Sequence, residues 1–208
     1  MTPAPTPGPQ LASAVELLER ALGYTRVVLA GIGPQDLGAP TPCSAWTLAR
    51  LLAHMEDALD AFIEAAAGQV HVEPVPPTED RLDALRDKAC ALLGAWTEAR
   101  PLAVQVGDRR LEAPLLVATA ALEIAVHGWD VAQATGLCTP IPEDLARGLH
   151  PIAARVVQPA DRGTRFAPAR RPASPTSRSD MLLAFLGRMT GPVGWKRGEP
   201  PSREGIAS

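Results

Sequence analysis

Aromatic residues and cysteines are scarce in this chain of 208 residues. Only 4% of the residues are aromatic, and the three cysteines, Cys43, Cys90 and Cys138, form no CxxC pair. A core with few aromatics must be built from aliphatic side chains and alanine, which favours helices over a β-sandwich. An odd number of widely spaced cysteines is typical of a reducing cytoplasm and not of a disulfide framework. We therefore expect a cytoplasmic, mainly helical protein.

Several familiar signatures of catalysis and targeting are also missing. The chain has no P-loop, no GxGxxG and no serine-centred nucleophile elbow. The N-terminus has no charged segment followed by an apolar one, so no signal peptide is expected. His54-Met55-Glu56 has the HxE spacing of the zinc deaminases, but their PCxxC partner motif is absent, which excludes this class.

Neither sign of charge dominates the chain, whose net charge is −3. Residues 1–150 carry 10 Lys/Arg and 19 Asp/Glu, a net of −9, whereas residues 151–208 carry 10 and 4, a net of +6. The small total gives no reason to expect nucleic acid or a membrane as a partner. The basic C-terminal part either folds against the acidic body or supplies arginines for an anionic substrate.

Apolar residues at three- and four-residue steps predict four long helices. Their approximate ranges are 11–29, 47–68, 78–98 and 114–135. The last of these is long and apolar enough to span a membrane, but it contains Glu123, His127 and Asp130, which indicates a core helix. Four amphipathic helices joined by short to medium loops favour an all-α fold, a four-helix bundle.

The rest of the chain adds smaller elements to this bundle. Extra short C-terminal helices are predicted over 142–157 and 179–188, and the segment 102–106 with the turn after it allows a small β-hairpin. The proline-rich residues 1–10 predict a disordered leader, and 191–208 predict a disordered tail. One helical domain is thus expected over residues 11–190.

A candidate metal site comes from the spacing of three polar residues. Glu123 and His127 are four apart, so on a helix they share one face, and in an apolar setting they need a partner. His54 lies at the edge of the apolar stripe of the second helix, from where its ring can point into a bundle core. Two imidazoles and a carboxylate suit zinc with an open position, and Ni, Fe or Mn are compatible. The alternative is an ordinary i,i+4 pair and a histidine without a metal.

Asp130 lies almost one helical turn beyond His127. It could accept a hydrogen bond from a metal-binding imidazole, or it could be a solvated acid near the end of the helix. We favour the second interpretation from the sequence.

Four stretches together resemble a known family: Pro40–Thr47, Leu51–His54, Glu123–Gly136 and Leu182–Arg188. They resemble the mycothiol-dependent maleylpyruvate isomerase metal-binding family of the DinB-like superfamily. The last of them is similar to the C-terminal segment of single-domain actinobacterial members. The chain departs from the family in Arg50, where an acidic residue is frequent, and in having no counterpart of the C-terminal sterol-carrier-like domain.

The resemblance implies a DinB-like four-helix bundle that binds a divalent metal, usually zinc, through His54, Glu123 and His127. It further implies a metal-dependent enzyme that uses mycothiol as a thiol cosubstrate and acts as an isomerase or S-transferase on a small electrophilic substrate. A substrate carboxylate would need an arginine, and the candidates in this chain are Arg81, Arg86, Arg162 and Arg165.

Other functions stay open at this point. One is a non-catalytic metal-binding or regulatory interaction module that contacts its partner through the basic segment 155–171. Another is a biosynthetic enzyme, such as a cyclase, with diverged chemistry, because a fold does not fix a reaction. Homodimerisation through an exposed apolar helix face is also open, and no residue is assigned a catalytic role.

Overall fold

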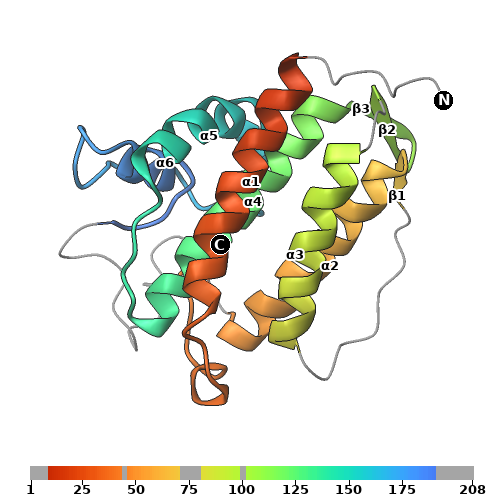
Figure 1. The fold of residues 1–208 in the computed structure, drawn as a ribbon. Helices are drawn as coiled ribbons and strands as arrows, with labels where there is room; N and C mark the ends of the chain where they lie inside the picture. The colour runs from red at the N-terminus through yellow and green to blue at the C-terminus, as the bar shows by residue number, and fades with distance from the viewer. Residues whose placement is uncertain (1–8, 44–45, 71–80, 99–101, 191–208) are drawn as a thin grey trace.

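Six α-helices and three short strands make up the described part of the chain, which in this computed structural model is residues 9–43, 46–70, 81–98 and 102–190 (Figure 1). The all-α fold class predicted from the sequence is confirmed. The helices are α1 (Pro9–Leu29), α2 (Leu48–Ala66), α3 (Arg81–Glu98), α4 (Ala113–Thr135), α5 (Glu143–Val156) and α6 (Arg178–Phe185). Short 3-10 turns lie at Pro34–Asp36 and Pro159–Asp161.

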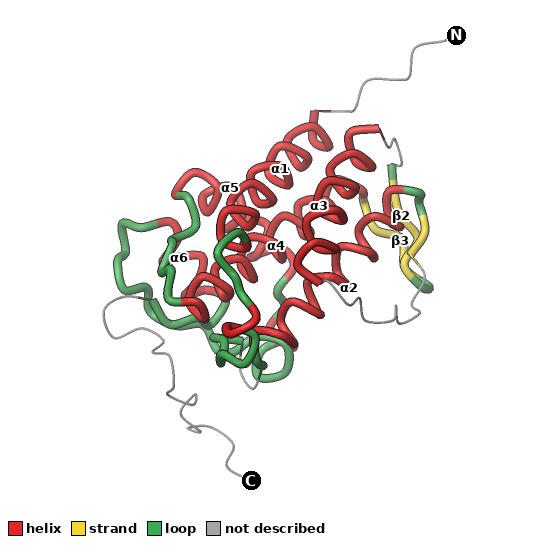
Figure 2. The backbone as a smooth tube through the Cα atoms, turned by 60° about the horizontal axis from the view of Figure 1, so that its bottom comes forward, coloured by secondary structure: helices red, strands yellow, loops and turns green. Residues whose placement is uncertain are grey.

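The bundle consists of two helix pairs. α1 packs along α4, and α2 packs along α3, while α5 packs on α4 on the side away from α3 and α6 packs on α5 (Figures 1 and 2). Apolar faces of all four long helices meet in the core, where Leu18, Leu51, Leu92 and Ala121 are fully buried. The long helices therefore associate through the apolar stripes that the sequence pattern predicted.

Helix α4 is apolar almost all round because it lies in the centre of the protein. By length and composition it could cross a membrane, but 83% of its most apolar window is buried inside the protein. Pro114 lies in its first turn, and the left-handed Gly136 ends it, both as predicted. Helix α1 lies close against it at Gly128, and the Thr25 hydroxyl donates to the Ile124 carbonyl at 2.9 Å.

The predicted β-hairpin is present and leads directly into α4. It consists of β2 (Ala103–Val106) and β3 (Arg109–Glu112), which pair antiparallel. A two-residue strand, β1 (Gln69–Val70), pairs parallel with β2. Two residues are too short to show an alternating pattern, so β1 was not predicted.

Two helix boundaries differ from the sequence-based expectation. Helix α1 begins at Pro9, inside the predicted leader, because proline is tolerated in a first turn. Helix α6 ends at Phe185 and not at Arg188, because Gly187 adopts a left-handed conformation with φ of +83°. This turn directs Arg188 back toward α4. Residues 1–8 and 191–208, the remainder of the predicted leader and tail, lie outside the described residues.

Candidate metal centre

The structure brings together the three residues that the sequence proposed as metal ligands. His54 comes from α2, and Glu123 and His127 come from successive turns of α4. Each offers one ligand atom, and these atoms lie within 4.8 Å of one another. The two imidazole rings meet edge to face, with centroids 5.1 Å apart. A single ion could therefore reach all three groups after small side-chain adjustments.

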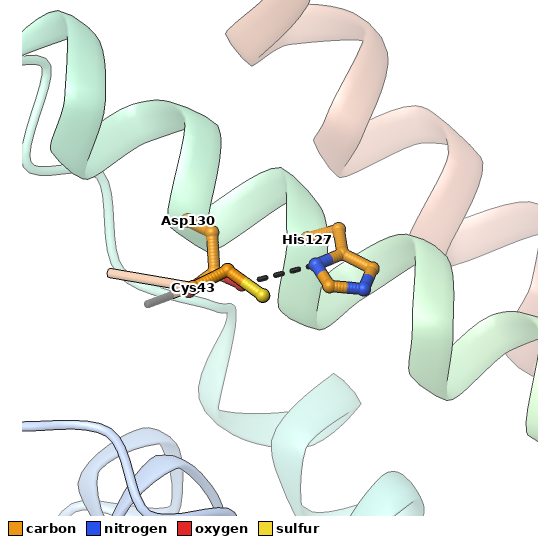
Figure 3. A group of neighbouring side chains, drawn as sticks. All are labelled: Cys43, His127 and Asp130. Atoms are coloured by element: carbon orange, nitrogen blue, oxygen red, sulfur yellow. Dashed lines mark hydrogen bonds and ion pairs between the residues drawn. The ribbon is translucent and has the colours of Figure 1, made fainter. Parts of the chain in front are cut away.

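The orientation of His127 is fixed by carboxylates on both of its nitrogens. Its Nδ1 lies 3.0 Å from Oδ2 of Asp130, and its Nε2 lies 3.3 Å from Oε2 of Glu123 (Figure 3 shows the Asp130 contact). Because a carboxylate only accepts, Nδ1 carries the proton in this contact. Nε2 is then the atom that faces Glu123 and His54, as a metal-binding imidazole requires.

Asp130 is not the solvated acid that we favoured from the sequence. Its side chain is 0% exposed, and besides His127 it contacts Arg188, whose Nε and Nη2 donate to Oδ1 and Oδ2 at 3.3 and 2.8 Å. A buried carboxylate needs such compensation. The compensating arginine is distant in sequence, so helix spacing alone could not reveal it.

The titration of the three candidate ligands follows from these contacts. Burial disfavours the charged form of His127, but hydrogen bonds to Asp130 and Glu123 outweigh it and raise its pKa to about 9. Burial likewise opposes ionisation of Glu123, yet its hydrogen bond and charge interaction with His127 lower its pKa to about 2. The pKa of His54 is lowered, first by burial and then by repulsion from His127. His54 is thus ready to bind a cation, whereas His127 must first release a proton.

A second group of potential ligands, Cys43, His127 and Asp130, fits a metal less well. Figure 3 shows the Cys43 sulfur directed toward the contact between His127 and Asp130. Burial raises the pKa of the Cys43 thiol to about 11, so it is protonated at neutral pH and is a poor ligand. Asp130 is already engaged by Arg188. The donor chemistry therefore favours His54, Glu123 and His127.

Two cavities meet at the candidate ligands. The first, of about 450 Å³, has mixed polar and apolar walls that include His54, Trp46, Arg165 and Arg188. The second, of about 660 Å³, lies among α1, α2, α3 and α4 and is mainly apolar. We call them the polar cavity and the apolar cavity. They share only Glu123 and His127 among their lining residues.

The four arginines suggested for carboxylate binding have different roles in the structure. Arg81 forms an ion pair with buried Glu56 at 2.9 Å, and Arg162 donates to the backbone carbonyls of Ala167 and Phe185, so both hold the fold together. Arg86 contributes to the apolar cavity. Arg165 lines the polar cavity and, of the four, is the one placed beside the ligand set.

Sequence reasoning assigned no role to two further residues of the site. Arg188 supports Asp130, and the Trp46 ring meets the His54 ring edge to face, with centroids 5.0 Å apart. Both belong to the stretches that resemble the family, which was the only signal for them. The guanidinium of Arg50 lies over the Trp46 ring at 5.1 Å, so the residue that departs from the family at this position contacts the same tryptophan.

Comparisons with known proteins give the same picture as the geometry. Two relatives from two strains of Mycobacterium tuberculosis, the uncharacterized proteins MT0763 and Rv0738, are each 29% identical to this chain over 175 residues, which is 82% of the chain and 94% of the relative. Crystal structures of the mycothiol-dependent maleylpyruvate isomerase and of its histidine-to-alanine mutant have TM-scores of 0.51 and 0.50 at 22% and 21% identity. In each comparison the match covers 71% of this chain and 70% of the crystallised chain. This similarity supports the fold.

The family model described as the mycothiol maleylpyruvate isomerase N-terminal domain matches residues 18–132, more than half of the chain. This segment includes all three candidate ligands. The chain belongs to the mycothiol maleylpyruvate isomerase N-terminal domain family.

Proposed function

We propose that this protein is a metal-dependent enzyme that uses a low-molecular-weight thiol, mycothiol in the first place, to isomerise or conjugate a small electrophilic substrate. The observation that carries the proposal is the convergence of His54, Glu123 and His127 at the meeting point of two cavities. Family membership supports mycothiol as the thiol. We assign this function to a single helical bundle, residues 11–190.

The three ligands would hold a divalent cation, with zinc as the first expectation. A bound divalent metal lowers the pKa of a coordinated thiol, so that thiolate is available at neutral pH. His127 enters this arrangement through Nε2 because Asp130 keeps its Nδ1 protonated. Glu123 supplies the single negative charge of the set, and the open side of the set faces the cavities.

The polar cavity fits the thiol cosubstrate. His54, Glu123 and His127 line it together with Arg165 and Thr164, which can bind polar or anionic groups of a hydrophilic thiol. The Arg165 side chain is 72% exposed and contacts Asp161 at 3.4 Å, so its guanidinium can turn toward a ligand at little cost. Addition of the thiolate to an electrophilic double bond forms a C–S bond. Protonation of the neighbouring carbon completes S-transfer, whereas rotation and elimination give cis–trans isomerisation.

An open cavity beside the ligand set supports turnover over a purely regulatory metal site. A regulatory module needs no space for a second molecule next to the metal. Here the polar cavity of about 450 Å³ carries two arginines, Arg165 and Arg188, and adjoins all three ligands. This volume lies within the usual range of about 300–1,000 Å³ for small-molecule sites. A cytoplasmic location and homodimerisation stay predictions.

Metal content tests the first half of the proposal. The purified protein is expected to bind about one equivalent of zinc, measured by elemental analysis after dialysis against the metal. His127→Ala should abolish this binding. His150→Ala is the matched control, because His150 lies in α5 and packs on Phe185, outside the ligand set. Equal zinc content in all three proteins would contradict the proposed site.

Thiol-dependent activity tests the second half. The zinc-loaded protein is expected to accelerate conjugation of mycothiol with an α,β-unsaturated carbonyl compound. The loss of free thiol over time measures the rate. His54→Ala and Glu123→Gln should reduce the rate to the uncatalysed level, while His150→Ala should not. A protein that binds zinc but neither binds nor conjugates the thiol would support the interaction module instead.

A further inference from the structure

The lining of the apolar cavity does not match a polar cosubstrate. Of about 660 Å³, it is lined by aliphatic side chains of four helices, among them Leu22, Leu29, Met55, Leu59 and Leu93. Its charged residues other than Glu123 and His127 are exposed. Glu123 and His127 also line it, and both are reached from the polar cavity as well. The candidate metal site is therefore open to one polar and one apolar cavity.

One residue that lines this cavity, Gly23, has no side chain that could fill it. It lies in the middle of α1, where glycine costs stability relative to alanine. A Cβ at this position would have no heavy atom within 4 Å, so no packing contact requires glycine. Ala58 and Ala89 on α2 and α3 also line the cavity and are small. Larger side chains at these positions could fill the space, and their absence leaves room for a ligand.

The length of the cavity suits an extended apolar group. Its lining residues on α1 run from Glu19 to Ala30, and those on α3 run from Leu85 to Leu93. At 1.5 Å per residue, these helix segments measure about 12 to 16 Å. Thr25, midway along the α1 lining, contacts Ile124 and Gly128, so Glu123 and His127 lie near the middle of this length. A group with its reactive end there can extend about 8 to 9 Å toward either end of the α1 lining.

We propose that the apolar cavity binds the hydrophobic tail of the substrate, so that the electrophile is an amphiphile with an alkyl or similar apolar chain and not a small dicarboxylate. This inference rests on the proposed function for the identity of the reaction, but the binding of the tail depends on the cavity alone. The electrophilic end lies at Glu123 and His127, and the thiol approaches it from the polar cavity. The two reactants thus reach one point from differently lined spaces.

Binding of neutral alcohols tests the cavity without metal, thiol or catalysis. In a series from 1-butanol to 1-octanol, measured by calorimetry on the full chain, each added methylene is expected to tighten binding about 3- to 4-fold. Neutral probes remove any contribution from the arginines. Gly23→Leu, which places a side chain into the open space, should weaken 1-octanol binding at least about 10-fold.

Gly94→Leu is the matched control. Gly94 lies in α3, is exposed and does not line the cavity, and a Cβ placed there would likewise have no heavy atom within 4 Å. Both substitutions replace a helical glycine, so both should raise helix stability equally. Affinity that does not depend on chain length, or that falls equally in the two variants, would overturn the proposal.

Two cysteines of the chain give a second measurement that does not depend on a variant. Cys90 and Cys138 are both exposed and free, but of the two only Cys90 lines the apolar cavity. Bound 1-octanol should slow alkylation of Cys90 by iodoacetamide and should leave the alkylation of Cys138 unaffected. Peptide mass spectrometry measures both rates. Equal rates at Cys90 with and without the alcohol would contradict occupation of the cavity.

A kinetic series separates this inference from the proposed function. With zinc-loaded protein and mycothiol, kcat/KM for trans-2-alkenals should rise with chain length from butenal to decenal in the native protein and in Gly94→Leu, but not in Gly23→Leu. The thiolate adds to the β-carbon, and the α-carbon takes a proton from water. Conjugation without chain-length dependence would refute the tail site and retain the proposed function. Length-dependent alcohol binding without conjugation would refute the proposed reaction and retain the tail site.

Discussion

Arg188 and Asp130 form a buried ion pair that joins the segment after α6 to the C-terminal part of α4. The Arg188 Nη2 donates to Asp130 Oδ2 at 2.8 Å, and the two side chains are 11% and 0% exposed. The same carboxylate oxygen contacts His127 Nδ1 at 3.0 Å. The C-terminal part of the described chain thereby determines how a candidate metal ligand is held.

Arg188→Ala is expected to destabilise the protein by about 3–5 kcal/mol, because it leaves a buried carboxylate without its guanidinium partner. The free energy of unfolding from urea denaturation measures this. Arg155→Ala is the control, since Arg155 and Glu112 form an exposed pair at 3.3 Å, and its loss should cost less than about 1 kcal/mol. Similar losses for the two variants would show that the Asp130 contact is not stabilising.

Asp130→Asn is expected to weaken zinc binding about 10- to 100-fold, because an amide is a weaker acceptor for His127 Nδ1–H and a less negative neighbour. Competition with a chromophoric chelator gives the affinity. Asp144→Asn removes a carboxylate that pairs with Arg20 at the surface, and its zinc affinity should be unchanged. An unaltered affinity in Asp130→Asn would remove this residue from the metal site.

The metal-free protein should lose stability as the pH rises from about 6.5 to about 9. The pKa of His127 is raised from 6.5 to about 9 in the folded state, so the folded state holds this proton more tightly than the unfolded state. The resulting stabilisation is complete below the unfolded pKa and is lost as the pH passes the folded one. Its upper limit, at 1.36 kcal/mol per pKa unit, is about 3 kcal/mol.

Thermal unfolding of chelator-treated protein across this range measures the effect, and His127→Gln should remove the pH-dependent part. With zinc present the sign reverses, because the ion competes with the proton on His127 and binds more tightly at higher pH. A metal-free protein with the same pH profile as His127→Gln would contradict the assigned titration.

Gly187→Ala should damage both the fold and the site. Gly187 has a φ of +83°, and a Cβ there would meet the Cβ of Ala167 at 2.7 Å and its carbonyl oxygen at 2.8 Å. We expect a loss of about 1–3 kcal/mol and weaker zinc binding, because Arg188 is displaced from Asp130. Gly163→Ala, with a φ of +84° but no atom near its Cβ, separates the backbone effect from the clash. Equal zinc affinity in all three proteins would show that this turn does not position Arg188.

The sequence predicted the main elements of the fold because their signals are local. Periodic apolar residues define the long helices, Pro114 and Gly136 mark the ends of α4, and Thr47 caps α2 by accepting from the Arg50 amide at 3.4 Å. The proximity of the three candidate ligands was also within reach, since Glu123 and His127 share a helix face and a bundle has only one interior; their role as metal ligands stays a prediction. The strand β1 depends on its pairing with β2, and the early end of α6 depends on the left-handed Gly187. The periodicity of apolar residues encodes neither feature.

The parts of the site that the sequence did not predict depend on contacts between distant segments. Asp130 has the spacing of a solvated helix-end acid, and only the return of the chain after Gly187 brings Arg188 to it. The four candidate arginines could not be ranked by sequence, because their partners, such as Glu56 for Arg81, come from other helices. The two cavities are properties of packing, and no motif indicates them.

His54 and Glu123 lie on different helix pairs and are separated by a long stretch of chain. An ion held by both would close a loop of about 70 residues, and it would bind only to the folded state. Its stabilising effect would then grow with the logarithm of the free metal concentration. The melting temperature of this protein would be a property of the preparation, set by how much metal it retained, and unfolding experiments would be comparable only at a buffered metal activity.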